Sequence, residues 1–470
     1  MGSQVSQLLT RDFARRHMVL PSFSHGGDGV AHCLPSTPDH VIHNLELRLG
    51  ARLERVEMDP EPLAEKIDAA FGNAQPSSEF SRGDQPSKSS SKRDLLSLAQ
   101  SDLLTTEGKG AVVRFVDDLL LAALRNSVSD LHLQPSGSSL MVRERIDGLL
   151  RTTSHIPIEY GAAVTSRVKV LGQMDIAERS IAQDGRATVR IGEGLVDLRV
   201  STFPTKHGER TVVRLLDQRQ SLGTLEGLGF PLEVLPSYLS QAKRPSGLIL
   251  VTGPTGSGKT TTLYTTLAAI ADPRKNVITI EDPIEYELSA QNEAISQSQT
   301  NSKKGHSFAR GLRHMLRQDP DVILIGEIRD AETARIAIQA SLTGHLVFST
   351  LHTNDSAGAI SRLVDLGLEP FLVASCLNCI LAQRLIRQLH TECRGRGCED
   401  CHQTGFLGRI GLFEFLECET SIQGLIQQNA GHREIWEAAK KNGVMTLLER
   451  GRQMVEGGIT TEAELRRVLA

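Results

Sequence analysis

An eight-residue segment, GPTGSGKT, carries the clearest chemistry in this sequence. It occupies residues 253–260 and follows the apolar run 248–251, so it lies between an expected buried strand and an expected helix. Its glycines let backbone N–H groups turn toward phosphate oxygens, while Lys259 adds a positive charge and the Thr260 hydroxyl can hold Mg²⁺. A glycine-rich turn can match such a pattern by chance, but the complete match between a strand and a helix favours a nucleoside triphosphate site. The predicted nucleotide-binding residues are Gly253, Pro254, Thr255, Gly256, Ser257, Gly258, Lys259, Thr260 and Asp282.

Acidic residues follow two further apolar strands and would complete a site for phosphate transfer. Glu327 comes just after the apolar run 322–325, and because ligands bind at the carboxyl ends of parallel strands, its carboxylate should face the γ-phosphate. There it can orient and activate the attacking water, or hold Mg²⁺ through water. Glu281 and Asp282 follow the run 277–280 and should face the same crevice. The alternative for Glu327 is an ordinary exposed acid at the end of a strand.

One histidine follows the next apolar strand. His352 lies in the sequence STLHT, after the run 346–349, and its ring can sense the γ-phosphate through a hydrogen bond. An isolated histidine is more often a structural residue. Its place at a strand end in the same fold favours a position near the nucleotide.

Histidine and cysteine residues form a second group with ligand-like spacing. The sequence HTECRGRGCEDC at 390–401 has the pattern H-x2-C-x4-C-x2-C, and both residue types suit tetrahedral zinc. The candidate ligands are His390, Cys393, Cys398 and Cys401. Because all four positions would be protein ligands, the role would be structural; the alternative is a degenerate module that binds no metal. Cys376 and Cys379 share the C-x2-C spacing, but they lie in an apolar helical run where cysteine packs as a small hydrophobe.

These residues need an ordered set of elements to bring them together. From residue 227 onward, apolar strands alternate with longer helical patterns, which predicts a mostly parallel sheet with helices on both faces. Residues 110–126 have helical spacing and precede several alternating strands, which predicts a second α/β domain. The Ser-, Pro-, Gln- and Lys-rich segment 73–93 is typical of a flexible linker after a small N-terminal α/β domain. The expected divisions are 1–72 (N-terminal domain), 73–100 (linker), 101–220 (second domain), 227–389 (nucleotide-binding domain), 390–408 (Cys/His module) and 409–470 (helical region).

Composition limits the other possibilities. A net charge of −4 and an aromatic content of 4% give no support to a chain that wraps nucleic acid. No run of 18 apolar residues is present, and the N-terminus lacks the apolar core of an export signal, so we expect a cytoplasmic chain. The cysteine count of 7 is odd, which in such a chain favours metal binding or burial over a disulfide framework.

The motifs, taken in order, resemble those of the secretion and pilus ATPases. They are GPTGSGKTTT, TIEDPIEY, LRHMLRQDPDVILIGEIRDAETA and TGHLVFSTLHTN, preceded by SDLHLQP and LRVSTFPTKHGERTVVRLL, and the resemblance covers residues 110–416. It implies an α/β chain with a RecA-like ATPase domain, a smaller PAS-like second domain and a small N-terminal docking domain. In that family the segments at Glu281, Glu327 and His352 are called the Asp box, the Walker B segment and the His box.

The resemblance also implies residues that spacing alone does not single out. Arg199 and Arg214 match the family's arginines, which the second domain brings to the nucleotide when the domains close; Arg210 is a weaker candidate. On sequence alone each is a solvated strand charge. Secretion ATPases often carry a zinc module with two C-x2-C pairs and a longer insert, whereas here His390 replaces the first cysteine and the insert has four residues. The predicted catalytic residues are Glu327, Glu281, Arg199, Arg214 and His352.

The same resemblance implies a hexameric ATP hydrolase that uses ATP with Mg²⁺, holds structural Zn²⁺ and drives type II secretion by pseudopilus assembly. Its partners would be inner-membrane assembly and platform proteins, which would recruit it from the cytoplasm; it would meet the membrane only through them. Type IV pilus assembly is the alternative, and a single small N-terminal domain favours secretion. A pilus retraction motor would lack that domain and the cysteine module. A nucleic-acid translocase has no support from the charge, and intact Lys259 and Glu327 argue against a scaffold that binds nucleotide without turnover.

Overall fold

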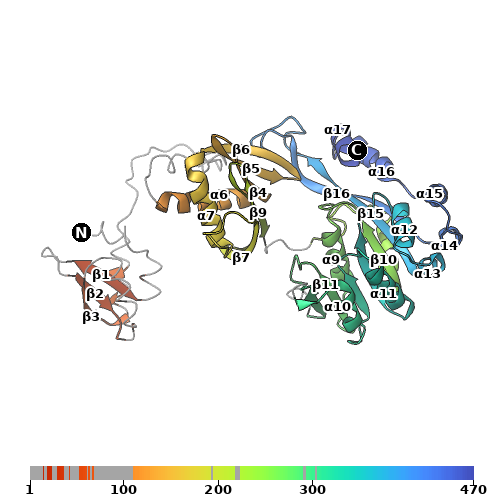
Figure 1. Cartoon of the computed structure of the whole chain (residues 1–470), viewed down its shortest axis with the longest axis horizontal. Helices are drawn as coiled ribbons and strands as arrows, with labels where there is room; N and C mark the ends of the chain where they lie inside the picture. The colour runs from red at the N-terminus through yellow and green to blue at the C-terminus, as the bar shows by residue number, and fades with distance from the viewer. Residues whose placement is uncertain are drawn as a thin grey trace. The chain divides into compact units, whose positions relative to one another are not determined.

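The chain divides into two compact units, Met1–Ser89 and Ser90–Ala470, and each is described by itself (Figure 1). The computed structural model describes short stretches between residues 14 and 67, and residues 109–470 except 192–193, 218–222, 289–292 and 302–303. The predicted linker, 73–100, therefore lies outside the described residues. Among the described residues, no helix is both long enough and apolar enough to cross a bilayer.

The first unit contains a three-stranded sheet with the order β1-β2-β3. β1 (Val19–Phe23) pairs antiparallel with β2 (Gly29–Cys33), and β2 pairs parallel with β3 (Leu53–Glu57). Leu63 and Ile67, which follow β3 in helical turns, are fully buried in the same small core as the strands. The described part of this unit is therefore α/β, as the sequence predicted.

The second unit begins with a six-stranded antiparallel sheet of order β6-β5-β4-β9-β8-β7. Two helices, α6 and α7, contact each other and share one apolar core with this sheet (Figure 1). Asp147 and Gly148 both have positive φ, 48° and 83°, which suits the tight hairpin turn between β5 and β6 that an Asp-Gly dipeptide favours. The elements are α6 (Lys109–Arg125), β4 (Val128–Pro135), β5 (Ser139–Ile146), β6 (Leu149–Pro157), α7 (Gly161–Leu171), β7 (Gln183–Ile191), β8 (Gly194–Thr205) and β9 (Gly208–Asp217).

A seven-stranded sheet of order β12-β11-β13-β14-β10-β15-β16 follows, and it positions the phosphate loop. All its neighbouring pairs are parallel except β15 with β16. The strands are β10 (Gly247–Thr252), β11 (Val277–Glu281), β12 (Ile295–Gln299), β13 (Val322–Ile325), β14 (Leu346–Leu351), β15 (Leu377–Leu389) and β16 (Phe406–Glu417). α8 (Leu235–Ala242) precedes β10, and the helices between the strands are α9 (Lys259–Ile270), α10 (Phe308–Met315), α11 (Ala331–Leu342), α12 (Ser356–Asp365) and α13 (Pro370–Cys376).

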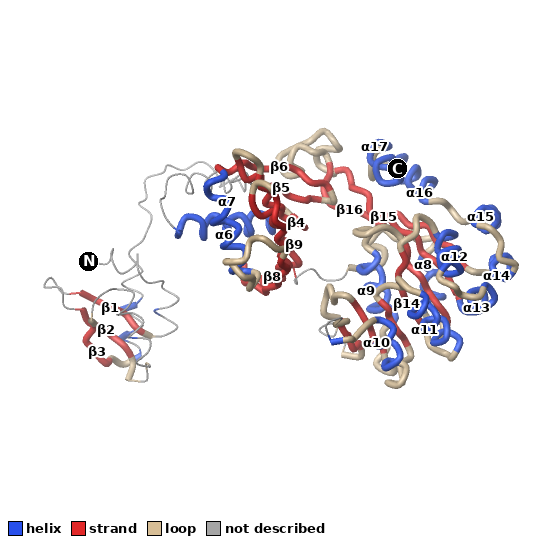
Figure 2. Tube along the Cα trace, in the orientation of Figure 1, coloured by secondary structure: helices blue, strands red, loops and turns tan. Residues whose placement is uncertain are grey.

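This sheet is buried on both faces, as expected for strands that alternate with helices (Figure 2). Along β10, Leu248 and Leu250 belong to one apolar core, whereas Ile249 and Val251 belong to the core on the opposite face. Because successive side chains point to opposite faces of a strand, the run Leu-Ile-Leu-Val needs no polar alternation. The predicted parallel sheet with helices on both faces is therefore confirmed.

Two local predictions were wrong at the C-terminal side of this sheet. The apolar run around Cys376 and Cys379 is helical only as far as Cys376; Cys379 lies on β15, next to β10. A continuous apolar run fits a buried helix and a buried central strand equally well, and here the sheet decided between them. Both cysteines are buried, so their predicted packing role is confirmed. Residues 409–417, expected in a helical region, instead form most of β16.

Four short helices complete the chain, as the charged helical patterns after residue 422 predicted. They are α14 (Thr420–Gln427), α15 (His432–Lys441), α16 (Leu447–Glu456) and α17 (Glu462–Leu469). α16 packs on β16 and α17 packs on β15. Glu464 of α17 is almost fully buried and accepts hydrogen bonds from the backbone N–H and the guanidinium of Arg387, at 3.1 and 2.7 Å. These helices therefore fix the strand that runs beside the phosphate loop.

Candidate functional site

The phosphate loop joins the end of β10 to the start of α9. Gly258 caps α9 with φ 86°, Gly256 has φ 78° and Gly253 has φ 153°. A Cβ atom on Gly253 would lie 2.4 Å from the backbone oxygen of Gln383, so this position has no room for a side chain. The backbone conformation therefore favours glycine at all three positions, and close approach also requires it at Gly253.

Lys259 begins α9 and its side chain is buried inside the loop. Its Nζ donates hydrogen bonds to the carbonyl oxygens of Gly253 and Pro254, at 2.8 and 3.0 Å. Burial lowers the pKa of Lys259 to about 8; Glu327 opposes this shift and Arg384 adds to it. The ammonium group is thus held in the loop with incomplete solvation, which favours a phosphate anion as its partner.

Glu327 and His352 come together as the sequence predicted. They follow β13 and β14, which pair in parallel with Ile325 opposite Ser349. The Nε2 atom of His352 lies 3.2 Å from one carboxylate oxygen of Glu327. The other oxygen of Glu327 pairs with the guanidinium of Arg329 at 2.6 Å. A carboxylate, an imidazole and a guanidinium therefore meet beside the carboxyl ends of β13 and β14, in the same sheet as β10, which leads to the phosphate loop.

Glu281 and Asp282 occupy different environments. Glu281, at the end of β11, is buried and accepts hydrogen bonds from Thr279 Oγ1 at 2.6 Å, from Gln297 Nε2 at 3.0 Å and from the hydroxyl of Tyr264. Burial raises its pKa, and these donors oppose the rise. Asp282 is exposed and acts electrostatically on Arg329, beside Glu327. The structure thus leaves Asp282, and not Glu281, open to solvent and ions.

The two predicted arginines lie opposite each other on β8 and β9, but they have different partners. Arg199 donates to both carboxylate oxygens of Glu285, at 3.1 and 3.0 Å, and to the carbonyl of Ile284 at 3.3 Å. It therefore reaches the loop that follows Glu281. The Nε atom of Arg214 donates to Asp130 at 2.9 Å, within its own sheet.

The weaker candidate Arg210 also lies in that sheet, on β9. Its guanidinium is 3.3 Å from the Nδ1 atom of His132, on the neighbouring strand β4. Among the described residues, the structure thus connects only Arg199 of these three arginines to the segment after β11.

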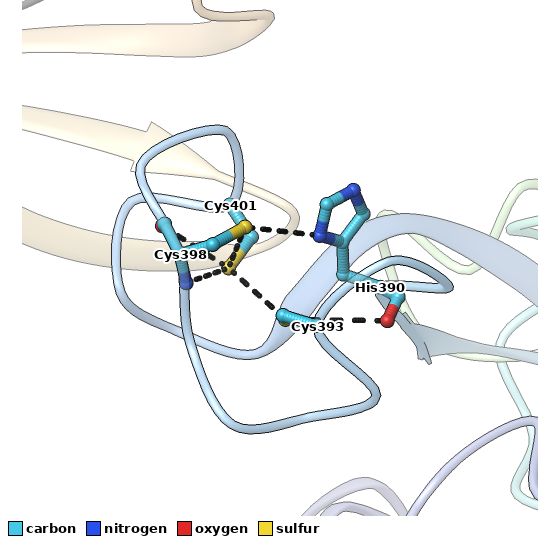
Figure 3. Close-up of side chains that lie close together, drawn as sticks. All are labelled: His390, Cys393, Cys398 and Cys401. Atoms are coloured by element: carbon cyan, nitrogen blue, oxygen red, sulfur yellow. Dashed lines mark hydrogen bonds between the residues drawn. The ribbon is translucent and has the colours of Figure 1, made fainter.

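The four predicted metal ligands form a compact cluster (Figure 3). Their ligand atoms all lie within 4.8 Å of one another. The Sγ atom of Cys401 lies 3.8 Å from that of Cys393 and 3.6 Å from that of Cys398, and the latter is 3.2 Å from Nδ1 of His390. Such sulfur separations are close to the edge of a tetrahedron with metal–sulfur bonds of about 2.3 Å, the zinc value. One nitrogen and three sulfur donors therefore fit zinc.

The loop around this cluster supports thiolate formation. Burial alone would raise the pKa of Cys401, but the backbone N–H groups of Cys398 and Gly405, each 3.2 Å from its sulfur, lower it to about 6. Gly395 and Gly405 have φ of 81° and 75°, and a Cβ on Gly405 would lie 2.3 Å from the Gly395 oxygen. The chain turns back within the short insert, and Gly395 of the insert packs against Gly405.

The Cys/His module also meets the antiparallel sheet. The N–H of Gly408 donates to Asp147 in the β5–β6 turn at 3.0 Å, and Arg409 lies 3.7 Å from the same carboxylate. A cavity of about 250 Å³ lies here, and Arg151 and Cys401 are among its lining residues. No residue of the phosphate loop lines it, so we give it no part in hydrolysis.

Three residues of the site were not predicted. Arg329 is in the motif that follows β13, and its charge could have been noticed there. Tyr264 lies among threonines and leucines within α9, and Arg384 lies within the mainly apolar strand β15; nothing in their local sequence distinguishes them.

Comparison with known proteins identifies the family. Residues 105–467 match the family described as "Type II/IV secretion system protein". Type II secretion system protein E of Klebsiella pneumoniae is 41% identical over 493 aligned residues, which cover 98% of this chain and 96% of that protein. Type II secretion system protein HxcR of Pseudomonas aeruginosa is 46% identical over 376 residues, covering 78% of this chain and 79% of that protein.

Solved structures agree on the fold. The pilus retraction motor PilT, solved with bound ADP, is 28% identical with a TM-score of 0.55, and the match covers 75% of this chain and 96% of PilT. The ATPase DotB of Legionella pneumophila has a TM-score of 0.59 at 22% identity, covering 75% of this chain and 94% of DotB, and indicates the fold alone. The predicted RecA-like fold is thereby confirmed. The chain belongs to the type II/IV secretion system protein family and is an ATP-hydrolysing type II secretion ATPase.

Proposed function

We propose that this chain is a cytoplasmic hexameric motor that couples ATP hydrolysis to pseudopilus assembly at the inner membrane. The observation that supports it best is the contact of His352 and Arg329 with the two oxygens of Glu327, at the carboxyl ends of β13 and β14 in the sheet whose strand β10 leads to the phosphate loop. The relatives named type II secretion system protein E support the choice of machine.

Each predicted residue has a role in this proposal. Lys259 and the loop N–H groups hold the phosphates, while Thr260 and Asp282 hold Mg²⁺, which neutralises charge as the phosphoryl group transfers. Glu327 orients the attacking water, and His352 senses whether the γ-phosphate is present.

Arg199 and Arg214 supply positive charge from the second domain when it closes on the nucleotide. Their present partners differ: Arg199 already reaches the segment after β11, whereas Arg214 must exchange its bond with Asp130. Glu281 assists at Mg²⁺ only if one of its three hydrogen-bond donors is displaced.

Replacing the water-orienting carboxylate tests the mechanism. Glu327→Gln in the full-length chain keeps the shape of the side chain but removes the base, so kcat should fall about 10²–10⁴-fold while ATP binding persists. Glu437→Gln, an exposed change on α15, is the matched control and should hydrolyse ATP at the original rate. Unchanged hydrolysis by Glu327→Gln contradicts the proposed role.

Partner binding and assembly distinguish the two machines. The full-length chain is titrated with the cytoplasmic domain of the secretion assembly protein and, separately, with the pilus platform protein from the same source. Binding to the first alone supports type II secretion, and binding to the second alone makes the chain a pilus extension motor. The solution mass with a non-hydrolysable ATP analogue should be that of a hexamer; a monomer under all conditions rejects the assembly.

Zinc is the metal that the Cys/His donor set fits, and its role is to hold the 390–401 loop closed. The purified chain should contain about one zinc per chain, and Cys398→Ser should lose it. Cys418→Ala changes a buried cysteine outside the cluster and should keep the metal. Equal, negligible metal in all three proteins would make this a module that has lost its metal.

A further inference from the structure

Two adjacent residues of β15, Gln383 and Arg384, contact the phosphate loop and the segment that follows His352. β15 runs parallel to β10, with Ala382 opposite Thr252, the last residue before the phosphate loop. Both side chains are buried, with exposed fractions of 2% and 8%. Because successive residues of a strand point to opposite faces, one strand position can contact structures on both sides of the sheet.

Gln383 contacts the phosphate loop at both ends. Its Oε1 atom accepts a hydrogen bond of 2.8 Å from Thr262, in the first turn of α9. A Cβ atom added to Gly258 would lie 2.9 Å from the Nε2 atom of Gln383. A Cβ atom added to Gly253 would lie 2.4 Å from the carbonyl oxygen of Gln383. The loop and the start of α9 therefore rest against this one residue.

Arg384 contacts the segment that carries His352. Its Nη2 atom donates to the carbonyl oxygen and the side-chain oxygen of Asn354, at 2.9 and 3.3 Å, and its Nη1 atom donates to the carbonyl of Gln383 at 3.0 Å. The same segment is also tied to β10, because the N–H of Thr353 donates to Thr252 Oγ1 at 2.9 Å. Arg384 thus joins two segments. It binds the carbonyl oxygen of Gln383, which lies against Gly253, and it binds Asn354, two residues after His352.

The positive charge of Arg384 is unfavourable for stability at this buried position on β15. Burial lowers its pKa, Glu414 and Asp355 oppose that shift, and no carboxylate of the described residues lies within ion-pair distance. A buried guanidinium without a contacting acid destabilises the fold, so a small apolar residue would suit a central strand better. The planar group does, however, donate in several fixed directions at once, which suits a residue that holds two loops.

We propose that Gln383 and Arg384 are positioning residues for ATP hydrolysis: Gln383 fixes the phosphate loop, and Arg384 fixes the segment that presents His352 to the γ-phosphate. Gln383 should then govern nucleotide binding and Arg384 the chemical step. A purely structural role would instead lower the stability of both variants without separating KM from kcat.

The test compares Gln383→Met and Arg384→Met in the full-length chain. For Arg384→Met we expect kcat to fall about 100-fold with the KM for ATP changed less than about 3-fold, since small displacements of a catalytic group cost rates of that order. For Gln383→Met we expect the KM to rise about 10-fold with kcat changed less than about 3-fold. Arg274→Met, at an arginine whose side chain is 88% exposed, is the control and should match the parent chain.

A conservative variant and a milder variant guard against misfolding. Arg384→Lys keeps one donor for Asn354 and should recover at least about tenfold of the lost kcat. Asn354→Ala changes an exposed residue and should lower kcat several-fold. Added to Arg384→Met, it should cause no further loss of kcat, because both changes break the same contact between Arg384 and Asn354. The proposal is overturned if KM and kcat shift together in both β15 variants, if only the melting temperature falls, or if the Asn354 and Arg384 losses simply add.

Discussion

We propose that the phosphate loop and the Cys/His cluster bind ligands of opposite charge. Both contain glycines with positive φ that bend a short segment. The proposed ligand of the loop is an anion, held by backbone N–H groups and Lys259, and that of the cluster is a cation, held by thiols and an imidazole. The two sites differ in how many segments of the chain supply their side chains. The cluster takes all its donors from residues 390–401, whereas the nucleotide site collects side chains from the ends of β10, β13 and β14 and from β15.

The two sites also differ in which groups shift the pKa of their central residue. Burial lowers the pKa of Lys259 to about 8, and backbone N–H groups lower the pKa of Cys401 to about 6 against the effect of burial. Both groups are therefore prepared for a ligand, but Lys259 depends on charges carried by other strands. The Cys/His cluster, which comes from one segment, requires only the turns of that segment to bring its groups together. The nucleotide site, which comes from several strands, requires those strands to pair in the correct register.

The largest effect should come from Lys259→Met. Removing this charge from the phosphate loop should lower kcat/KM for ATP about 10²–10³-fold, since a fixed cation at the phosphates stabilises the transition state. Zinc content, measured on the same sample, should be unchanged because the cluster shares no residue with the loop. Loss of zinc along with activity would contradict the independence of the two sites.

A pair of glycine changes should sharpen the contrast in packing. Gly405→Ala places a Cβ 2.3 Å from the Gly395 oxygen, so the opening free energy of amides in 390–405, measured by hydrogen exchange, should fall about 3 kcal/mol. Gly256→Ala has a similar φ, 78°, but meets nothing within 4 Å.

Gly256→Ala, the control change, should therefore destabilise the loop only through the left-handed backbone conformation at residue 256. Amides in 253–260 should lose about 1 kcal/mol of opening free energy in Gly256→Ala. Equal losses for the two variants would show that backbone conformation, and not the contact between Gly395 and Gly405, sets the stability of the module.

A third contrast should be a pH dependence confined to the nucleotide site. With a pKa of about 8, Lys259 in the empty protein is charged below that pH and neutral above it. Phosphate binding favours the charged form, so binding takes up a proton at higher pH, and ADP affinity should fall about tenfold for each pH unit above 8. Glu327 and Arg384 are the charged groups that act on Lys259 here.

Calorimetric titration of ADP at pH 7, 8, 9 and 10 measures this dependence. Lys440→Met, on the exposed end of α15, should leave the curve in place. A flat affinity from pH 7 to pH 10 would mean that Lys259 stays charged throughout.

Features whose chemistry is local could be recognised from the sequence alone. The phosphate loop, the Cys/His cluster and the Asp147-Gly148 turn were predictable because each depends on residue types at short spacing. The meeting of Glu327 with His352 was also predictable, since parallel strands end at one edge of a sheet.

Only the tertiary structure decided which distant groups touch. An apolar run around Cys379 fits a helix or a strand, and its place beside β10 made it a strand. The bond between Thr262 and Gln383 joins residues 121 positions apart on α9 and β15, and Gln297, a partner of Glu281, lies on the neighbouring strand β12. Arg199 contacts a loop that belongs to the other sheet. Such contacts depend on how strands are paired, and no short segment of the chain encodes that pairing.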